Sequence, residues 1–292
     1  MTLKQLQAFY WICRMGGFSA AAKRLNSTQT AISMRIRELE QSFGVKLFER
    51  GGRELRMTSK GRELYPLAEE LLEKTARIQS AISDPASMSG MVHLGVTDFI
   101  AVTWLPLLVR AIEEKFPNVL VEMDVDLGPN IQHKIDSAEV DLALMPGPLP
   151  GRHYLHRHLG SVEFAWMASP SLGVPDKLAH EDLEQLPHLS LRKASNSYNL
   201  VQDWLSARNI RFRRTYFCAN MQVLISLTLD GLGISHLPLD YVRPHIESGR
   251  LRVISIPPDM ESLEYYAIFD PKLASVIVQS VADLAVNCSS FQ

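Results

Sequence analysis

The sequence predicts a multidomain α+β protein with a small helical head, a long linker helix and a two-lobed α/β body. The first reason is charge. Residues 1–60 hold 11 Lys and Arg against four Asp and Glu, a net charge of +7, whereas the rest of the chain holds 19 against 28, a net charge of −9. The second is heptad spacing between Leu64 and Ile82. The third is an alternation of strand-like and helix-like segments after residue 91, which is typical of α/β layers.

Composition places the chain among globular proteins. Of its 292 residues, 46% are hydrophobic and 21% charged, close to the averages for folded domains, and the length favours about two domains. No apolar run reaches the roughly 18 residues that span a bilayer, the first residues lack a signal-peptide core, and three scattered cysteines make no disulfide framework. We therefore expect a soluble cytoplasmic protein whose basic head binds a polyanion.

The head is expected to hold three helices. Apolar residues at helical spacing predict a first helix that ends at Gly16. Ser19 is expected to cap a second helix over residues 20–25, and the polar run 26–28 to start a third over about 29–42. A short helix, a brief turn and a longer helix form the helix-turn-helix arrangement.

The third helix has a predicted buried stripe and an opposite polar face. Rotation by 100° per residue places Ile32, Ile36, Leu39 and Phe43 on one side. The candidate base-contacting residues lie on the other side, on a flank or at the N-terminal end: Gln29, Thr30, Ser33, Met34 and Arg37. An ordinary amphipathic helix with a solvated face is the alternative.

A short hairpin is expected next. The segments 46–50 and 54–57 are strand-like and flank two glycines, which suits a wing with Arg50 and Arg53 near its tip. Arginines in that position can pair with phosphates beside the major groove.

The linker helix is expected from Thr58 to about residue 83, with Pro66 kinking its first turns. Its seam consists of Leu64, Ala68, Leu71, Thr75, Ile78 and Ile82. Such a seam would pair two chains and place two recognition helices on two half-sites. The alternative is a helix packed on its own domain.

The body is expected to alternate strands and helices. The expected strands are residues 92–96, 120–125, 140–145, 164–168, 189–191, 215–218, 234–237, 251–256 and 265–268. The expected helices are residues 97–116, 130–137, 198–208, 222–230, 239–247 and 273–286. This alternation predicts mostly parallel strands in two lobes, with a ligand cleft at strand carboxyl ends and helix N-termini.

The whole chain resembles the LysR-type transcriptional regulators. The specific signal lies in residues 18–25 (FSAAAKRL), 28–33 (TQTAIS), 36–40 (IRELE) and 44–50 (GVKLFER), followed by Leu55, Thr58 and Gly61. Looser matches are residues 104–106 (WLP), 140–143 (VDLA) and 231–238 (GLGISHLP). One departure concerns base readout. The family often has Pro at the position of Thr30 and a polar or basic residue at that of Met34, whose thioether can only touch a thymine methyl.

The resemblance implies a winged helix-turn-helix over residues 1–58, a linker helix and hinge over 59–90, and a periplasmic-binding-protein-like effector domain over 91–292. Lobe I would comprise residues 91–160 and 266–292, and lobe II residues 161–265. It further implies a sequence-specific DNA-binding regulator that is not an enzyme and needs no cofactor. Its partners would be double-stranded operator DNA, a small-molecule effector, a second copy in a homodimer or homotetramer, and RNA polymerase.

The same resemblance, with chain position, places an effector site between the lobes. The candidate lining residues are Thr97, Asp98, Phe99, Ile100, Met145, Pro146, Ser195, Asn196, Ser197, Asn220, Met221 and His236. Helix starts that carry hydroxyls suit an anionic or polar ligand, although Asp98 opposes an anion. The alternative is that these residues only cap helices.

Three other kinds of function fit the sequence less well. His153, His156 and His158 cluster, but their spacing matches no established zinc pattern, and no metal site is expected. Cys218 lies in an apolar run and is expected to be buried and inert rather than a redox switch. The rival class is a solute-binding or enzymatic α/β protein with an incidental basic head, although no catalytic or nucleotide-binding motif is present.

Overall fold

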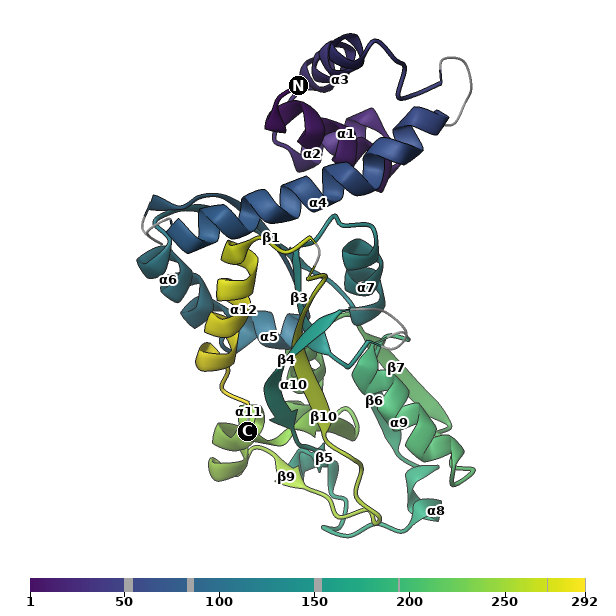
Figure 1. Cartoon of the computed structure of the whole chain (residues 1–292). Helices are drawn as coiled ribbons and strands as arrows, with labels where there is room; N and C mark the ends of the chain where they lie inside the picture. The colour runs from purple at the N-terminus through teal and green to yellow at the C-terminus, as the bar shows by residue number, and fades with distance from the viewer. Residues whose placement is uncertain (50–54, 83–86, 150–153, 194, 272, 292) are drawn as a thin grey trace.

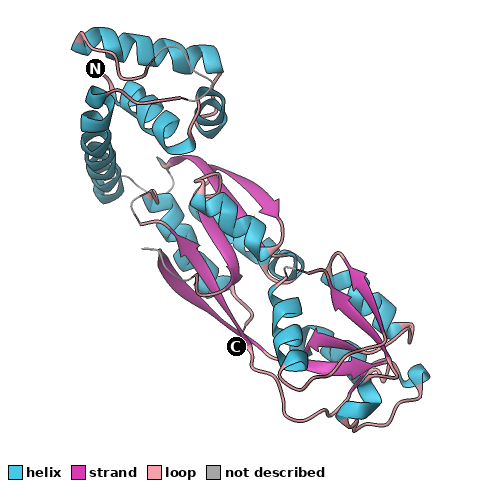
Figure 2. Ribbon diagram, turned by 90° about the vertical axis from the view of Figure 1, so that its right-hand side faces the viewer, coloured by secondary structure: helices cyan, strands magenta, loops and turns pink. Residues whose placement is uncertain are grey.

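A computed structural model describes residues 1–49, 55–82, 87–149, 154–193, 195–271 and 273–291. The head lies at one end, the long helix α4 crosses beneath it, and two α/β lobes follow (Figure 1). Figure 2 shows the strands of the two lobes as separate groups along the length of the molecule. None of the helices in the described residues is long and apolar enough to cross a membrane.

The head is a helical unit with its own core. Its helices and the linker are α1 (Leu3–Met15), α2 (Phe18–Arg24), α3 (Gln29–Phe43) and α4 (Ser59–Ile82). Thr28 caps α3 by accepting a hydrogen bond from the backbone amide of Ala31, and Gly44 ends it in the left-handed conformation that glycine favours. Aliphatic and aromatic side chains from α1, α2, α3 and the start of α4 form one cluster.

Two expectations for the head are wrong. The second helix begins at Phe18 with Gly17 as its N-cap, and the Ser19 hydroxyl instead donates to Oε1 of Gln29 at 3.0 Å. Phe43 is 43% exposed, because the core cluster that encloses Ile32 and Leu39 ends before the last turn of α3. The rest of the predicted stripe on α3 is confirmed as buried.

In the described part of the wing, Phe48 and Met57 form an antiparallel bridge. The Glu40 carboxylate supports its base by accepting hydrogen bonds from the backbone amide of Leu47 at 2.9 Å and from Lys46 Nζ at 2.6 Å. The expected phosphate contacts at the tip, Arg50 and Arg53, lie outside the described residues.

The heptad seam on α4 divides into two parts. Leu64 and Ala68 pack into the head core. Farther along the helix, Leu71 is 40% exposed and Ile78 is 61% exposed. The first turns therefore anchor the helix to its own head, whereas the later turns present apolar side chains to the outside.

Lobe I is built on one mixed sheet. Its elements are β1 (Ser89–Val96), α5 (Asp98–Val102), α6 (Leu105–Lys115), β2 (Asn118–Val125), α7 (Gly128–Asp136), β3 (Leu142–Pro146), β4 (Leu155–Val162), β10 (Leu263–Phe269) and α12 (Val276–Cys288). The strand order is β2-β1-β3-β10-β4. Strands β1, β2 and β3 are parallel, whereas β10 pairs antiparallel with both β3 and β4.

Lobe II has two smaller sheets. Its elements are β5 (Phe164–Ala168), η2 (Pro170–Leu172), α8 (His180–Leu183), β6 (Pro187–Leu191), α9 (Asn196–Ser206), β7 (Arg214–Cys218), α10 (Met221–Leu229), β8 (Ser235–Pro238), α11 (Leu239–Glu247) and β9 (Arg252–Val253). The strand orders are β8-β5-β9 and β6-β7. The chain enters lobe II after β4 and returns in β10, and Val162 lies opposite Leu263 where the two strands pair.

Two expectations for the body are also wrong. The strands are mixed rather than mostly parallel. β4 carries the chain out to lobe II and β10 brings it back, so these two neighbouring strands run in opposite directions. The helix expected over residues 97–116 is two helices, α5 and α6. The break falls at Thr103, whose backbone is non-helical, and Trp104 is fully buried beside it.

Candidate DNA interface and ligand cleft

The outer face of α3 carries the candidate base-contacting residues. Gln29, Thr30 and Arg37 are exposed, Met34 is 55% exposed, and Ser33 is half-buried. Figure 1 shows α3 at the end of the molecule farthest from the two lobes. The same helix therefore offers an amide, two hydroxyls, a thioether and a guanidinium on its outward side, which is the arrangement that reading base edges requires.

A narrow cleft lies between the lobes. Eight of the twelve expected residues line it: Thr97, Asp98, Phe99, Pro146, Ser195, Asn196, Ser197 and Met221. They come from the ends of β1 and β3 in lobe I and from the starts of α9 and α10 in lobe II. The cavity measures only about 30 Å³, room for one or two water molecules, so the lobes are nearly closed on each other.

Polar groups face one another across this cleft. Asp98 Oδ2 accepts a hydrogen bond from the backbone amide of Met221 at 2.8 Å, which joins the lobes directly. The Thr97 hydroxyl is buried, and none of the described residues is its hydrogen-bond partner. Ser195 caps α9 by accepting from the backbone amide of Tyr198 at 3.0 Å. A buried hydroxyl with no partner favours a ligand that supplies the missing hydrogen bond.

Six further lining residues were not anticipated: Asp126, Leu127, Gly128, Phe164, Leu191 and Tyr265. The first three follow β2 and lead into α7, the same strand-to-helix position that identified Thr97 and Asp98. The expectation that residues between a strand end and a helix start line the cleft could therefore have identified these three. Tyr265 lies on β10, and the sequence alone does not show that this strand neighbours β3. Burial raises the pKa of Tyr265 above its usual range.

Four expected residues do not line the cavity. Ile100 and Met145 are buried in the lobe I interior, among apolar neighbours. Asn220 is exposed and caps α10 by accepting from the backbone amide of Val223 at 3.0 Å. His236 is buried in lobe II, with its ring stacked on Phe164 at 5.5 Å between centroids.

His236 belongs to a pair of buried histidines. Its ring and that of His188 both lie against Trp166, at centroid distances of 5.4 Å and 5.7 Å. Burial lowers the pKa of His188 to about 4 and that of His236 to about 3. Both imidazoles are therefore neutral at pH 7, and they serve the packing of lobe II.

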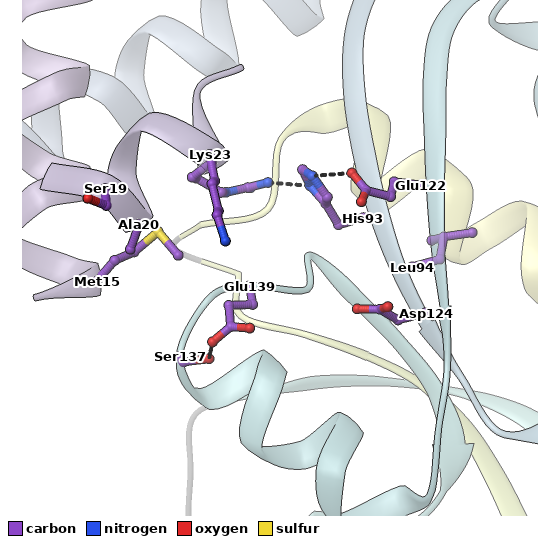
Figure 3. Close-up of a pocket in the computed structure, with 11 residues that line it drawn as sticks. Met15, Ser19, Ala20, Lys23, His93, Leu94, Glu122, Asp124, Ser137 and Glu139 are labelled. Carbon is purple, nitrogen blue, oxygen red and sulfur yellow. Dashed lines mark hydrogen bonds and ion pairs between the residues drawn. The ribbon is translucent and has the colours of Figure 1, made fainter. Parts of the chain in front are cut away.

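A second hollow lies between the head and lobe I. It has a volume of about 550 Å³, and its walls include Lys23 from α2 and Glu122 and Asp124 from β2. Figure 3 shows Lys23 on the head side and Glu122 beside His93 on the lobe I side. Basic and acidic side chains thus face each other across the junction of head and body.

The histidine cluster and Cys218, which could suggest metal or redox chemistry, have other surroundings in the structure. His158 Nε2 lies 2.5 Å from a carboxylate oxygen of Glu264, and His153 lies outside the described residues. Within the described parts of the chain, no three His, Cys, Asp or Glu side chains are placed to hold a metal ion. Cys218 is buried, and burial raises the pKa of its thiol, so the reactive thiolate is disfavoured.

Two family models match the chain. Residues 3–62 match the helix-turn-helix of the lysR family of bacterial regulatory proteins, and residues 85–287 match the LysR substrate binding domain. Among curated relatives, the uncharacterised HTH-type transcriptional regulator YeiE of Escherichia coli (strain K12) is 26% identical over 262 residues, which cover 88% of this chain and 87% of that protein.

Solved structures share the fold. Full-length LysG from Corynebacterium glutamicum with bound effector Arg superposes with a TM-score of 0.64 at 17% identity, over 99% of this chain and 98% of that one. Vibrio fischeri DarR in complex with DNA gives a TM-score of 0.57 at 20% identity, over 99% of each chain.

Proposed function

The chain belongs to the LysR family of bacterial helix-turn-helix regulators, and from this we propose how its parts divide the work. It is a transcriptional regulator with a helix-turn-helix DNA-binding domain and an effector-binding domain, and not an enzyme. In our proposal, residues 1–58 bind operator DNA, residues 59–90 pair two chains, and residues 91–292 sense a small molecule. We also propose that the protein works in the cytoplasm, where bacterial DNA lies.

The exposed polar face of α3 on a head of net charge +7 is the observation that carries the DNA proposal. In the major groove, Arg37 would donate to guanine and Met34 would contact a thymine methyl. Gln29, Thr30 and Ser33 would approach base edges or phosphates near the helix start. Arg50 and Arg53 would hold flanking phosphates. The structurally similar DarR is in complex with DNA, which supports a DNA-binding role for the head.

A small polar effector is the ligand that the cleft supports best. The unpartnered Thr97 hydroxyl and the start of α9 at Ser195 would bind its polar groups. Asp98 and Asp126 disfavour an isolated anion at the same place. Because the cavity holds only about 30 Å³, entry requires the lobes to separate and then close over the ligand. LysG carries bound Arg, which supports an effector role for this domain without naming the molecule here.

Two exposed apolar surfaces suit self-assembly. On α4, Leu71 and Ile78 lie on the heptad seam. On the edge strand β2, Met123 at 43% and Val125 at 54% are exposed on one face, and Leu120 at 64% is exposed on the other. One surface would form a homodimer through α4, and a second surface would join dimers into a homotetramer. The assembled regulator would then contact RNA polymerase at its promoters.

The DNA proposal is tested by selecting genomic fragments with the full-length protein and titrating affinity against salt. A regulator that neutralises phosphates loses affinity steeply, with a slope of about −0.9 per phosphate contacted. We expect a steep slope on the selected fragment and weaker binding to shuffled DNA of the same composition. A flat salt response with no preferred fragment would reject the proposal and favour the solute-binding alternative.

A further inference from the structure

The hollow between the head and lobe I is separate from the ligand cleft. Its volume of about 550 Å³ falls within the range of roughly 300–1,000 Å³ that is typical of pockets for small molecules. The parallel strands β1 and β2 carry His93 and Glu122 into its wall, whereas Thr97 and Asp126, just after the same two strands, line the cleft. The hollow and the cleft therefore lie toward opposite ends of these strands.

The lobe I wall of the hollow is acidic. It carries Glu122 and Asp124 from β2 and Glu139 from the segment before β3. Glu122 and Asp124 lie on the same face of β2, because they are two residues apart. Their side chains are 68% and 54% exposed, and Glu139 is exposed as well. Three solvated carboxylates thus line one side of the hollow.

One of these carboxylates has a lysine as its partner, since Lys134 Nζ lies 3.0 Å from Asp124. Glu122 instead faces Nε2 of His93 at 3.3 Å, and Glu139 accepts a hydrogen bond from the Ser137 hydroxyl at 3.0 Å. Among the described residues, no Lys or Arg forms an ion pair with either glutamate. Both glutamates can therefore bind a cation that comes from outside.

The head wall carries two basic side chains. Arg24 Nη1 donates to Asp141 Oδ2 at 3.0 Å, and Nη2 donates to Oδ1, so the charge of Arg24 is already balanced. Lys23 is exposed, and Figure 3 shows it extending from α2 toward Glu139. Lys23 and Lys134 together face the three carboxylates, which leaves one negative charge in excess. The hollow therefore favours a cationic ligand over an anionic one.

Apolar side chains lie between the charged groups on the head side. Met15 at the end of α1 and Ala20 of α2 line the hollow, and both are half-buried. An aliphatic chain can pack on such side chains while its charged ends stay near water and carboxylates. The walls therefore suit a molecule in which methylene groups separate two or more cationic groups.

We propose that this hollow binds a linear aliphatic polyamine. One ammonium group binds Glu139, another binds Glu122 or Asp124, and the methylene groups between them lie on Met15 and Ala20. A ligand bound in this way touches the head and lobe I at once. This second site goes beyond the proposed function and does not depend on which effector occupies the cleft.

Calorimetric titration of the full-length protein with spermidine, in the absence of DNA, tests the site. We expect one site per chain. Its affinity should fall about tenfold in the double variant Glu122→Gln and Glu139→Gln, because each exposed ion pair contributes up to about fivefold. The double variant Glu113→Gln and Glu114→Gln makes the same change of charge on exposed residues of α6, and it should keep the full affinity.

The methyl signal of Met15 shows where spermidine binds. In protein labelled with ¹³C-methyl methionine, this signal is identified among eleven methionines by its loss in Met15→Leu. It should shift over the spermidine concentrations at which heat is released. The signal of Met34, which is exposed on α3, is the control and should stay in place.

Lys23→Ala separates a polyamine site from a site for a zwitterion. Because a polyamine competes with the Lys23 ammonium for the carboxylates, this variant should bind spermidine about two- to threefold more tightly. A zwitterion instead needs Lys23 to bind its own carboxylate, and 4-aminobutyrate is the probe for this class. If 4-aminobutyrate binds more tightly than spermidine and Lys23→Ala weakens it, the polyamine assignment is wrong.

Equal losses of affinity in the two double variants would show general attraction of spermidine to an acidic body, and would overturn the site. Absence of heat with spermidine, or a Met15 signal that does not move, would overturn it too. Circular dichroism of each variant checks that the fold is unchanged. None of these results bears on DNA selection or on the cleft, so failure of this inference is distinguishable from failure of the proposed function.

Discussion

The carboxylate of Asp98 in lobe I accepts a hydrogen bond from the backbone amide of Met221 in lobe II, at 2.8 Å. This bond spans the cleft at the start of α10, where a backbone amide has no partner inside the helix. A carboxylate in this position satisfies that amide and joins the two lobes directly. A ligand that competes for Asp98 would have to replace this bond.

Removal of this carboxylate should loosen the closed state. Asp98→Ala is expected to lower the free energy of unfolding of the body by about 1–3 kcal/mol, the cost of leaving a buried amide unpaired. Small-angle X-ray scattering of the full chain should show a larger radius of gyration. Asp98→Asn is the control, because its amide oxygen can still accept the hydrogen bond. Equal scattering for all three proteins would show that this contact does not hold the lobes closed.

Loss of base contacts should reduce sequence discrimination. Arg37→Ala and Ser33→Ala are each expected to lower the preference for the selected operator over random DNA by about 1–3 kcal/mol. Fluorescence anisotropy on both DNAs at one salt concentration measures the difference. The comparison on random DNA is the internal control, because a residue that only touches phosphates weakens both complexes equally. Equal losses would therefore assign Arg37 and Ser33 to the phosphate backbone.

A charge on the exposed part of the linker seam should separate the chains. Leu71→Glu places a carboxylate where apolar packing is expected, and sedimentation should show a smaller assembly. Glu70→Ala changes charge on the neighbouring position away from the seam, where Glu70 pairs with Lys74, and should leave the assembly intact. If Leu71→Glu sediments as the unmodified protein does, α4 is not the pairing surface.

Acid should destabilise lobe II through its two buried histidines. In the unfolded chain His188 and His236 take up protons below about pH 6.5, whereas burial holds their folded pKa values at about 4 and about 3. The unfolded state therefore binds more protons as the pH falls from 6.5 toward 4. At pH 5 each histidine is therefore expected to lower the free energy of unfolding by about 2 kcal/mol, relative to its value above pH 6.5.

Urea unfolding at pH 7 and pH 5 measures this loss. His236→Phe removes one titrating group and should shrink the difference between the two pH values by about half, whatever its effect on stability at pH 7. The exposed His133→Gln is the matched control and should keep the full difference. A difference that survives intact in His236→Phe would place the acid sensitivity elsewhere.

Sequence patterns predicted the elements better than the boundaries between them. Helical spacing identified α1 and α3, and the positions of β5 and α11 agree with the segments expected at 164–168 and 239–247. The N-cap of α2 was predicted at Ser19, which is wrong. Gly17 is the N-cap, and the Ser19 hydroxyl donates a hydrogen bond to Gln29 instead. The break between α5 and α6 at Thr103 is a tertiary effect that depends on the adjoining Trp104. The body buries this indole fully, which local propensity does not record.

The sequence predicted only part of the cleft, because some of its residues are brought there by tertiary contacts. Chain position after a strand identified Thr97, Asp98 and Pro146, since parallel strands end at one edge of a sheet. It could not identify Tyr265, which reaches the cleft from an antiparallel strand. Nor could it predict the ion pair between Arg24 of α2 and Asp141 of lobe I, because contacts between residues so distant in sequence depend on how the head docks.

The pairing of Val162 with Leu263 also has an evolutionary consequence. Everything between them leaves and re-enters the fold at neighbouring points, as an inserted domain does. A segment with adjoining ends can be replaced by recombination without disturbing its host. Lobe II of a relative, joined at β4 and β10, would keep the head and the lobe I sheet while changing half of the cleft wall. New chemical signals could thus be acquired by exchange of one module.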